Sequence, residues 1–427
     1  MKTILFHIDV NSAFLSWSAM DQLNKGGTID YRNIPAIIGG DIEKRHGIVL
    51  AKSIPAKSFG IRTGEPVTDA LKKCPNLVIL PPDHTLYHSQ SCALMEFLKN
   101  ICPEIEQVSV DECYMDYTPV ASRYTDPVTA ACQIKDSIRN TFGFTVNIGI
   151  SDRKVLAKMA SDFRKPDLVH TLFQNEISQK MWPLPVSSLF MCGLSSVEVL
   201  RNLGILTIGD LACADLNILT SHLKSHGKLL WEYANGIDSS EVETTQSEVK
   251  GIGNSTTLTQ DATTMMEIRR CLLSLSESVS TRLRHAGMRA EVVSVEIKYS
   301  SFQSVSHQSV LSSPSDTCNV IYQRACLLAD ELWSGSPVRL LGIRTSKLVS
   351  ASEPVQLTIF DLPVSGKDSV CPASQSEKQA ENLSLQKQVR LENALDVIRD
   401  KYGKESIVRG TLLRPASGRS RKPSGTP

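Results

Sequence analysis

Three acidic residues near the start of the chain are of the type that binds divalent cations. Asp9 closes the apolar run Ile4–Ile8, and Asp111 and Glu112 close an alternating run that starts at Ile105. β-Branched residues recur in both runs, so each is predicted to be a β-strand that delivers carboxylate to its end. Three carboxylates at one edge of a sheet can supply the oxygen ligands of two Mg²⁺ ions. The pattern therefore favours a metal-dependent phosphoryl-transfer site.

The composition bounds the class of protein. A chain of 427 residues, of which 41% are hydrophobic, is long enough for about three domains. No apolar run approaches the roughly 18 residues of a membrane span, and the N-terminus has no signal-peptide pattern. We therefore expect a cytoplasmic protein, monomeric and without membrane contact. The eleven cysteines form no C-x-x-C pair, which argues against zinc.

The distribution of charge says more than the net charge of +1. Residues 250–350 hold eleven basic against eight acidic side chains, and residues 404–427 hold six against one. Residues 166–238 hold four basic and seven acidic side chains. The late basic excess is a modest indication of contact with a phosphate backbone. On charge alone, an ordinary solvated surface is the better interpretation.

The periodicity predicts an α+β protein of several domains. Residues 1–165 alternate strands and helices and predict a mostly antiparallel, one-sided sheet. Residues 166–238 predict short helices joined by glycine turns, which can present N–H groups to a phosphate or can equally form a plain packed hairpin. Residues 255–350 predict a β-α-β-β-α-β unit. We expect disorder over residues 363–380 and in the last dozen residues, and an amphipathic helix over residues 391–402.

Four motifs, taken in order, resemble those of the Y-family (translesion) DNA polymerases, including the bacterial UmuC- and DinB-like members. The segment Phe6–Phe14 is similar to the opening of that family, and Ser109–Asp116 is similar to its central S-x-D-E-x-Y-x-D motif. Gly149–Pro166 resembles the third motif, and Ala56–Ile61 resembles the fingers motif. The likeness runs to about residue 350, and four motifs in order are far more specific than any one of them.

The resemblance implies a right-hand polymerase with a ferredoxin-like antiparallel palm sheet, fingers, a helical thumb with helix-hairpin-helix-like turns, an α+β little finger and a disordered C-terminal tail. The implied boundaries are palm 1–23 and 78–165, fingers 24–77, thumb 166–238, linker 239–254, little finger 255–350 and tail 351–427.

The resemblance also implies a function. Such enzymes add dNTPs to a primer 3′ end on a DNA template with low fidelity and without proofreading, in the response to DNA damage. Asp9, Asp111 and Glu112 would be the catalytic residues. Together with the backbone carbonyl of Val10 they would hold two Mg²⁺ ions, which suit phosphoryl transfer because the chemistry is mainly positioning and electrostatics.

Phe14 falls five residues after Asp9, where the family places a bulky steric gate against the 2′-hydroxyl of a ribonucleotide. The other interpretation of Phe14 is a core aromatic on a helix, which would be preferred without the resemblance. Lys57 and Lys165 would contact the triphosphate as point charges.

The fingers segment departs from the family pattern. Ile54 and Lys57 stand where many members have Tyr and Arg, and Ala51 stands where a hydroxyl residue is frequent. Isoleucine cannot hydrogen-bond a phosphate, and lysine cannot form a bidentate fork. We expect the nucleotide to be bound more weakly, or to be bound by other groups such as Ser53. Ala13, where a second aromatic is common, predicts a roomier pocket.

A short peptide follows the last predicted domain. Gln356–Phe360 resembles the bacterial sliding-clamp-binding pentapeptide, in which Gln356, Leu357, Ile359 and Phe360 would dock into the clamp, the β subunit. A chance match is the alternative, although a position in a tail favours the clamp peptide.

Two other functions fit parts of the sequence. A nucleotidyl cyclase would share the palm-like sheet, but the thumb-like and basic C-terminal regions argue against it. A catalytically weak or inactive relative that binds only DNA and the clamp is the second alternative. Three mutually repelling carboxylates argue against it, since they have little purpose without a cation.

Overall fold

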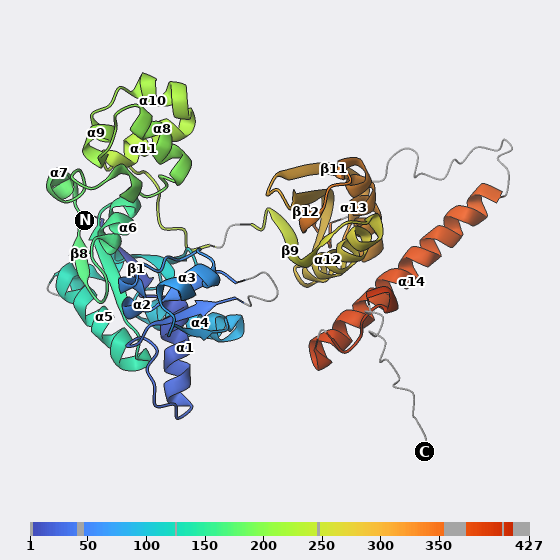
Figure 1. Cartoon of the computed structure of the whole chain (residues 1–427), viewed down its shortest axis with the longest axis horizontal. Helices are drawn as coiled ribbons and strands as arrows, with labels where there is room; N and C mark the ends of the chain where they lie inside the picture. Colours follow the sequence, from blue (N-terminus) through green and yellow to red (C-terminus); the bar gives the residue numbers. More distant parts are fainter. Residues whose placement is uncertain are drawn as a thin grey trace, which may run out of the picture. The chain divides into compact units, whose positions relative to one another are not determined.

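The structure is a computed structural model (Figure 1) that describes residues 3–40, 47–123, 126–245, 248–353, 373–403 and 405–412, with the side chains of residues 373–386 left undescribed. The chain divides into two compact units, residues 1–42 with 46–246 and residues 43–45 with 247–427. Each unit has a hydrophobic core of its own. In the described part of the chain, no helix combines the length and the apolar character that crossing a bilayer requires.

A five-stranded sheet forms the centre of the first unit. Its order is β5-β6-β1-β7-β8, and every pair is antiparallel except β7 with β8. This confirms the predicted, mostly antiparallel palm sheet. The strands are β1 (Leu5–Val10), β5 (Ile105–Gln107), β6 (Glu112–Asp116), β7 (Val146–Ser151) and β8 (Val169–Thr171).

Helices cover both faces of this sheet, so the expectation of a one-sided sheet is wrong. Strand alternation decides which side chain meets which helix. Phe6, Ile8 and Val10 point into the core on one face. The helices α1 (Ala13–Asn24), α4 (His84–Ile101) and α5 (Pro127–Phe142) contribute to that core. Helix α6 (Lys154–Asp162) lies against the other face. Helix α6 can approach the sheet closely because residue 149 is a glycine. A side chain at this position would collide with the backbone of α6.

The fingers form a smaller three-stranded sheet of order β3-β2-β4. Its parts are β2 (Ala36–Gly39), β3 (Val49–Lys52), β4 (Val78–Leu80), α2 (Ile54–Ser58) and α3 (Val67–Lys73). Strand β4 pairs in parallel with β2, so this sheet extends past position 77, where the fingers were expected to end.

The thumb is helical, as predicted, and shares its core with side chains of α6. The turn between α8 and α9 contains Gly204 at φ +77°, a conformation that glycine adopts without steric cost. The second pair, α10 and α11, meets at Lys224 rather than at a glycine. The helices are α7 (Ile177–Lys180), α8 (Leu194–Asn202), α9 (Ile208–Ala212), α10 (Leu216–Leu223) and α11 (Ser225–Ala234), and the short 3₁₀ turns of this unit are η1 (Thr118–Arg123), η2 (Gln174–Glu176) and η3 (Val186–Ser188).

The second unit contains the predicted β-α-β-β-α-β arrangement, with sheet order β11-β10-β12-β9. Helices α12 and α13 pack on one face of the sheet around its apolar core. Strand β9 begins at Gly251, inside the stretch expected to be a linker. The elements are β9 (Gly251–Ala262), α12 (Met265–His285), β10 (Met288–Tyr299), β11 (Ser304–Ser315), α13 (Cys318–Leu332) and β12 (Val338–Ser350).

A long helix, α14 (Ala373–Tyr402), and the short turn η4 (Gly410–Leu412) complete this unit. Helix α14 begins inside the stretch expected to be disordered. Its described side chains contact the little finger mainly through charge, because Arg284 of α12 lies 2.6 Å from both Glu392 and Asp396. The Glu392 carboxylate also accepts the backbone N–H of Cys318 at the start of α13.

Candidate active site

Asp9 and Glu112 are direct partners across strands β1 and β6. The expectation that Asp111 and Glu112 close a strand is wrong. Glu112 opens β6, and Asp111 lies in the turn before it. The turn forms because the N–H groups of Val108 and Ser109 both donate to the carbonyl of Glu112. Apolar and polar residues keep alternating through this turn, so the sequence pattern does not reveal it.

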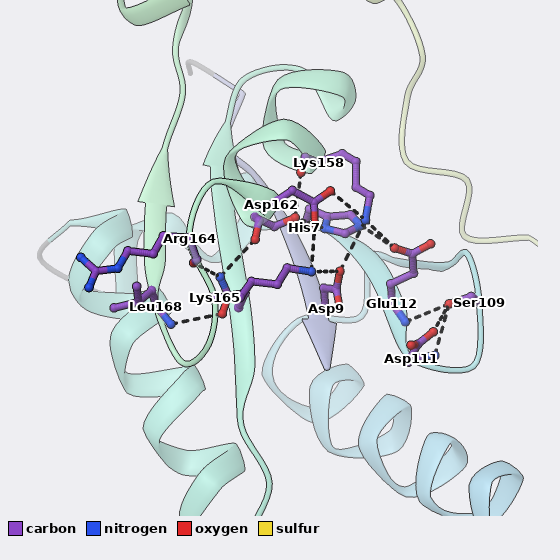
Figure 2. Close-up of polar contacts among 12 residues, drawn as sticks. His7, Asp9, Ser109, Asp111, Glu112, Lys158, Asp162, Arg164, Lys165 and Leu168 are labelled. Carbon is purple, nitrogen blue, oxygen red and sulfur yellow. Dashed lines mark hydrogen bonds and ion pairs between the residues drawn. The ribbon is translucent and has the colours of Figure 1, made fainter. Parts of the chain in front are cut away.

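Two lysines neutralise the paired carboxylates (Figure 2). The Lys158 Nζ atom lies 2.8 Å from Glu112 and 3.5 Å from Asp9. The Lys165 Nζ atom lies 2.7 Å from Asp9, and both lysines also face Asp162. Burial opposes the charge of each lysine, but the facing carboxylates outweigh it, chiefly Asp9, and hold both lysine pKa values above the ordinary one.

His7 lies beneath this pair on the same face of β1. Its Nε2 atom is 3.4 Å from a Glu112 oxygen, and its Nδ1 atom is 2.9 Å from the Ser161 hydroxyl. Burial lowers the pKa of His7. The neighbouring His7 ring and the Lys158 ammonium group together lower the pKa of Glu112 to about 2. Glu112 is therefore ionised at neutral pH.

Neither His7 nor Lys158 was among the site residues predicted from the sequence. Period-2 alternation places His7 on the face of Asp9, which would have been a usable signal. For Lys158 the only signal was its place in the third motif, on the helix that ends before Lys165.

The Asp111 side chain is hydrogen-bonded to Ser109. The Ser109 hydroxyl donates to an Asp111 carboxylate oxygen at 2.6 Å and accepts the N–H groups of Asp111 and Glu112 at 3.2 Å. Burial raises the pKa of Asp111, and the charges of Asp9 and Glu112 raise it further, against the hydrogen bond from Ser109. Among the described residues, no three acidic, histidine or cysteine side chains converge in a metal-binding cluster.

The donor set nevertheless fits a divalent cation. Carboxylate oxygens are what Mg²⁺ prefers, and Asp9 and Asp111 line the same cavity. The backbone keeps Asp111 close, because the N–H of Val10 donates to the Asp111 carbonyl at 3.0 Å. For Asp111 to bind the same cation as Asp9 and Glu112, its side chain would have to rotate away from Ser109.

A cavity of about 640 Å³ joins this carboxylate site to the fingers. Its wall includes Phe14, whose ring is stacked on Tyr87 with centroids 4.3 Å apart. Phe14 is partly buried at this wall, so the structure accommodates both interpretations of it, as a packed aromatic and as a gate. The predicted site residues that line the cavity are Asp9, Val10, Phe14, Ser53, Lys57, Asp111 and Lys165.

Ser53 does not supply the missing nucleotide contact, contrary to the expectation. Its hydroxyl accepts the N–H groups of Ala36 and Ala56, at 3.1 and 3.0 Å, and donates to the carbonyl of Ile34 at 2.7 Å. The side chain is buried and caps helix α2, so no proton or lone pair is left for a phosphate. Lys57, in contrast, is exposed at the cavity. The four predicted clamp-binding residues, 356, 357, 359 and 360, lie outside the described residues.

Two regions of this chain match models of a known protein family. Residues 8–162 match the impB/mucB/samB family, and residues 249–359 match the C-terminal domain of that family. A DNA polymerase IV of Clostridium acetobutylicum is 44% identical over 413 residues, which cover 97% of this chain and 99% of the relative. The chain belongs to the impB/mucB/samB family of Y-family DNA polymerases.

Further comparisons agree with this family assignment. A DNA polymerase IV 1 of Bacillus subtilis is 32% identical over 423 residues, with 98% of this chain and 95% of the relative covered. Among solved structures, the Y-family DNA polymerase chimera Dbh-Dpo4(243-245)-Dbh has a TM-score of 0.70 and 20% identity, and covers 81% of this chain and 99% of its own. That likeness shows the shared fold. The Y-family chain is thus a DNA-directed DNA polymerase of the translesion type, a class that depends on metal ions.

Proposed function

We propose that this Y-family chain adds dNTPs to the 3′ end of a templated primer by two-metal-ion nucleotidyl transfer, with low fidelity and without proofreading. The observation that carries the proposal is the cross-strand pair of Asp9 and Glu112, of which Asp9, together with Asp111, lines a cavity that Phe14 and the fingers complete. The reacting phosphate would lie at the carboxylates and the sugar would lie against Phe14.

Two Mg²⁺ ions are the proposed cofactor. Asp9, Asp111, Glu112 and the carbonyl of Val10 would hold them, once Asp111 turns from Ser109. When bound, such ions lower the pKa of the primer 3′-hydroxyl and neutralise the pyrophosphate that leaves. The low pKa of Glu112 keeps this ligand ionised, which metal binding requires.

The neighbouring side chains serve orientation and selectivity. Lys165, which reaches Asp9 across 2.7 Å, and Lys57 on α2 would contact the triphosphate. The Phe14 ring would exclude ribonucleotides, because its stacking on Tyr87 limits how far it can retreat from a 2′-hydroxyl. Positioning of this kind supplies much of the barrier reduction in phosphoryl transfer.

The second unit offers a surface for the duplex. A groove of about 650 Å³ lies on the sheet of the little finger and is lined mostly by small residues, among them Gly253, Ser255, Ser294 and Gly342, with Arg344 at its side. The serine hydroxyls and the Arg344 guanidinium of this lining can donate to phosphates, which carry no sequence information. We propose that this groove and the thumb turn at Gly204 hold primer–template DNA without sequence preference.

The finer assignments of partner and location are proposals as well. Gln356, Leu357, Ile359 and Phe360 would bind the sliding clamp and keep a monomeric, cytoplasmic enzyme on its template. Replacing Leu357 and Phe360 by alanine should abolish clamp binding and leave clamp-free extension intact. Retained affinity for the clamp in surface plasmon resonance would show that the peptide is incidental.

Primer extension tests the proposed function. Purified protein with Mg²⁺ and all four dNTPs should lengthen a labelled primer only as far as the template reaches, with incorporation that follows the template base. Cyclic nucleotide formed from NTP without template would instead support a cyclase. DNA binding without any extension would support an inactive relative.

A further inference from the structure

Two lysines at the fingers side of the cavity face it without a carboxylate partner. The cavity is lined by four basic residues, Arg32, Lys52, Lys57 and Lys165. Arg32 is paired with Asp30 at 2.8 Å, and Lys165 is paired with Asp9. Within the described residues, neither Lys52 nor Lys57 forms an ion pair. Both lysines thus line the cavity from the fingers, Lys52 at the end of strand β3 and Lys57 on helix α2.

Lys52 is the more constrained of the two. It ends strand β3 and is half-buried, and its ammonium group donates to the Thr63 hydroxyl at 3.1 Å, a neutral acceptor. Burial lowers its pKa, the charge of Lys57 lowers it further, and Glu65 opposes them only weakly. Glu65 itself is bound to Lys73 at 2.6 Å. A half-buried cation beside a second cation is destabilising unless an anion joins them.

Two side chains next to Lys52 on the same wall offer no hydrogen bond to an anion. Ile54 is 61% exposed and presents only hydrocarbon, and the Ser53 hydroxyl is fully used by the backbone. Among the described residues, Lys52 and Lys57 are therefore the cationic donors on this side that have no carboxylate partner for a polyanion to displace. Three donor hydrogens on a flexible stem suit phosphate oxygens of varied geometry.

We propose that Lys52, together with Lys57, binds the terminal phosphates of the incoming nucleoside triphosphate. The inference rests on the proposed function for the identity of the ligand and adds a residue that the fingers motif does not include. Lys52 is a binding residue rather than a group that touches the reacting atoms. Because the phosphates are charged before and after the reaction, loss of Lys52 should affect nucleotide affinity more than the maximal rate.

Lys52→Met removes the ammonium group and keeps most of the stem. In single-turnover extension at fixed Mg²⁺, the half-saturating dNTP concentration should rise roughly tenfold, the usual scale of one charged hydrogen bond, with a smaller change in maximal rate. Lys52→Arg should restore most of the affinity. Lys72→Met is the matched control, since Lys72 is an exposed fingers lysine that does not line the cavity.

Binding of inorganic tripolyphosphate, measured by calorimetry without DNA or metal, gives a readout independent of activity. Wild type should bind it several-fold more tightly than Lys52→Met, and as tightly as Lys72→Met. Equal tripolyphosphate affinity, with a half-saturating dNTP concentration within twofold of wild type, overturns the role of Lys52 alone. A wild type that never extends a primer contradicts the proposed function instead, and the tripolyphosphate comparison then still decides the role of Lys52.

Discussion

Asp9 and Glu112 lie opposite each other because β1 and β6 are antiparallel in the register that pairs these two positions. The sheet itself thus places two of the three carboxylates, and no loop has to close to bring them together. Lys158 lies between them, 2.8 Å from Glu112 and 3.5 Å from Asp9. The ammonium group supplies positive charge where, in our proposal, metal ions bind.

The ion pair of Lys158 with Glu112 predicts a pH-dependent loss of stability. The His7 ring first, and Lys158 in addition, lower the pKa of Glu112 from 4.5 to about 2. The ionised form of Glu112 therefore stabilises the fold above pH 4.5, and this contribution, of which Lys158 supplies a part, is lost as the pH falls toward 2. Lys158→Met should therefore destabilise the metal-free protein most above pH 4.5, with a difference from wild type that shrinks in acid. Urea unfolding at pH 7, 4.5 and 3 measures this.

The control for that series is Lys72→Met, which breaks an exposed pair with Asp69. Exposed pairs contribute little, so this variant should follow wild type at every pH. A Lys158→Met difference that stayed constant across the range would mean that the ion pair is not the cause.

Phe14→Ala should raise the incorporation of ribonucleotides, because the ring at the cavity wall no longer meets a 2′-hydroxyl. The ratio of kcat/KM for dNTP to that for the matching NTP measures the effect. Phe14→Tyr keeps the ring stacked on Tyr87 and should preserve discrimination. Since the ring is also partly buried, Phe14→Ala should lower the free energy of unfolding by about 2 kcal/mol. An unchanged sugar ratio in folded Phe14→Ala would leave the ring with a packing role only.

Arg284 should be needed for the stability of the second unit. It lies 2.6 Å from both Glu392 and Asp396, and Arg284→Met would leave these two buried carboxylates without their cationic partner. We expect a loss of about 3 kcal/mol in denaturant unfolding. Arg269→Met, on the same helix, breaks an exposed pair with Asp330 and should cost at most about 1 kcal/mol. Equal losses in the two variants would show that α14 is not held by these charges.

The fold was predictable where apolar periodicity is strong. The β-α-β-β-α-β unit and the mostly antiparallel palm sheet follow from it. Helix α14 was not seen as part of a packed domain, because the buried residues in its described part, Glu392 and Asp396, are acidic. A charged docking face has the sequence pattern of a solvated one.

The site was predictable in residue identity more than in geometry. Asp9 and Glu112 come together as expected, and Lys165 reaches Asp9. The hairpin turn at Asp111 and its hydrogen bond from Ser109 depend on local backbone geometry that alternation does not encode. Ser53 was misjudged because its position as the cap of α2 uses the hydroxyl that a nucleotide contact would need.

The central claim is that Asp9, Asp111 and Glu112 act as one metal-dependent site. Single-turnover primer extension by Asp111→Asn in Mg²⁺ tests it most directly, because this change keeps the side chain's size and removes its charge. We predict a rate at least about a thousandfold below wild type, on the scale of losing one preorganised charge at a reacting phosphate, with DNA affinity and unfolding unchanged. Extension at the wild-type rate by the folded variant would contradict the account.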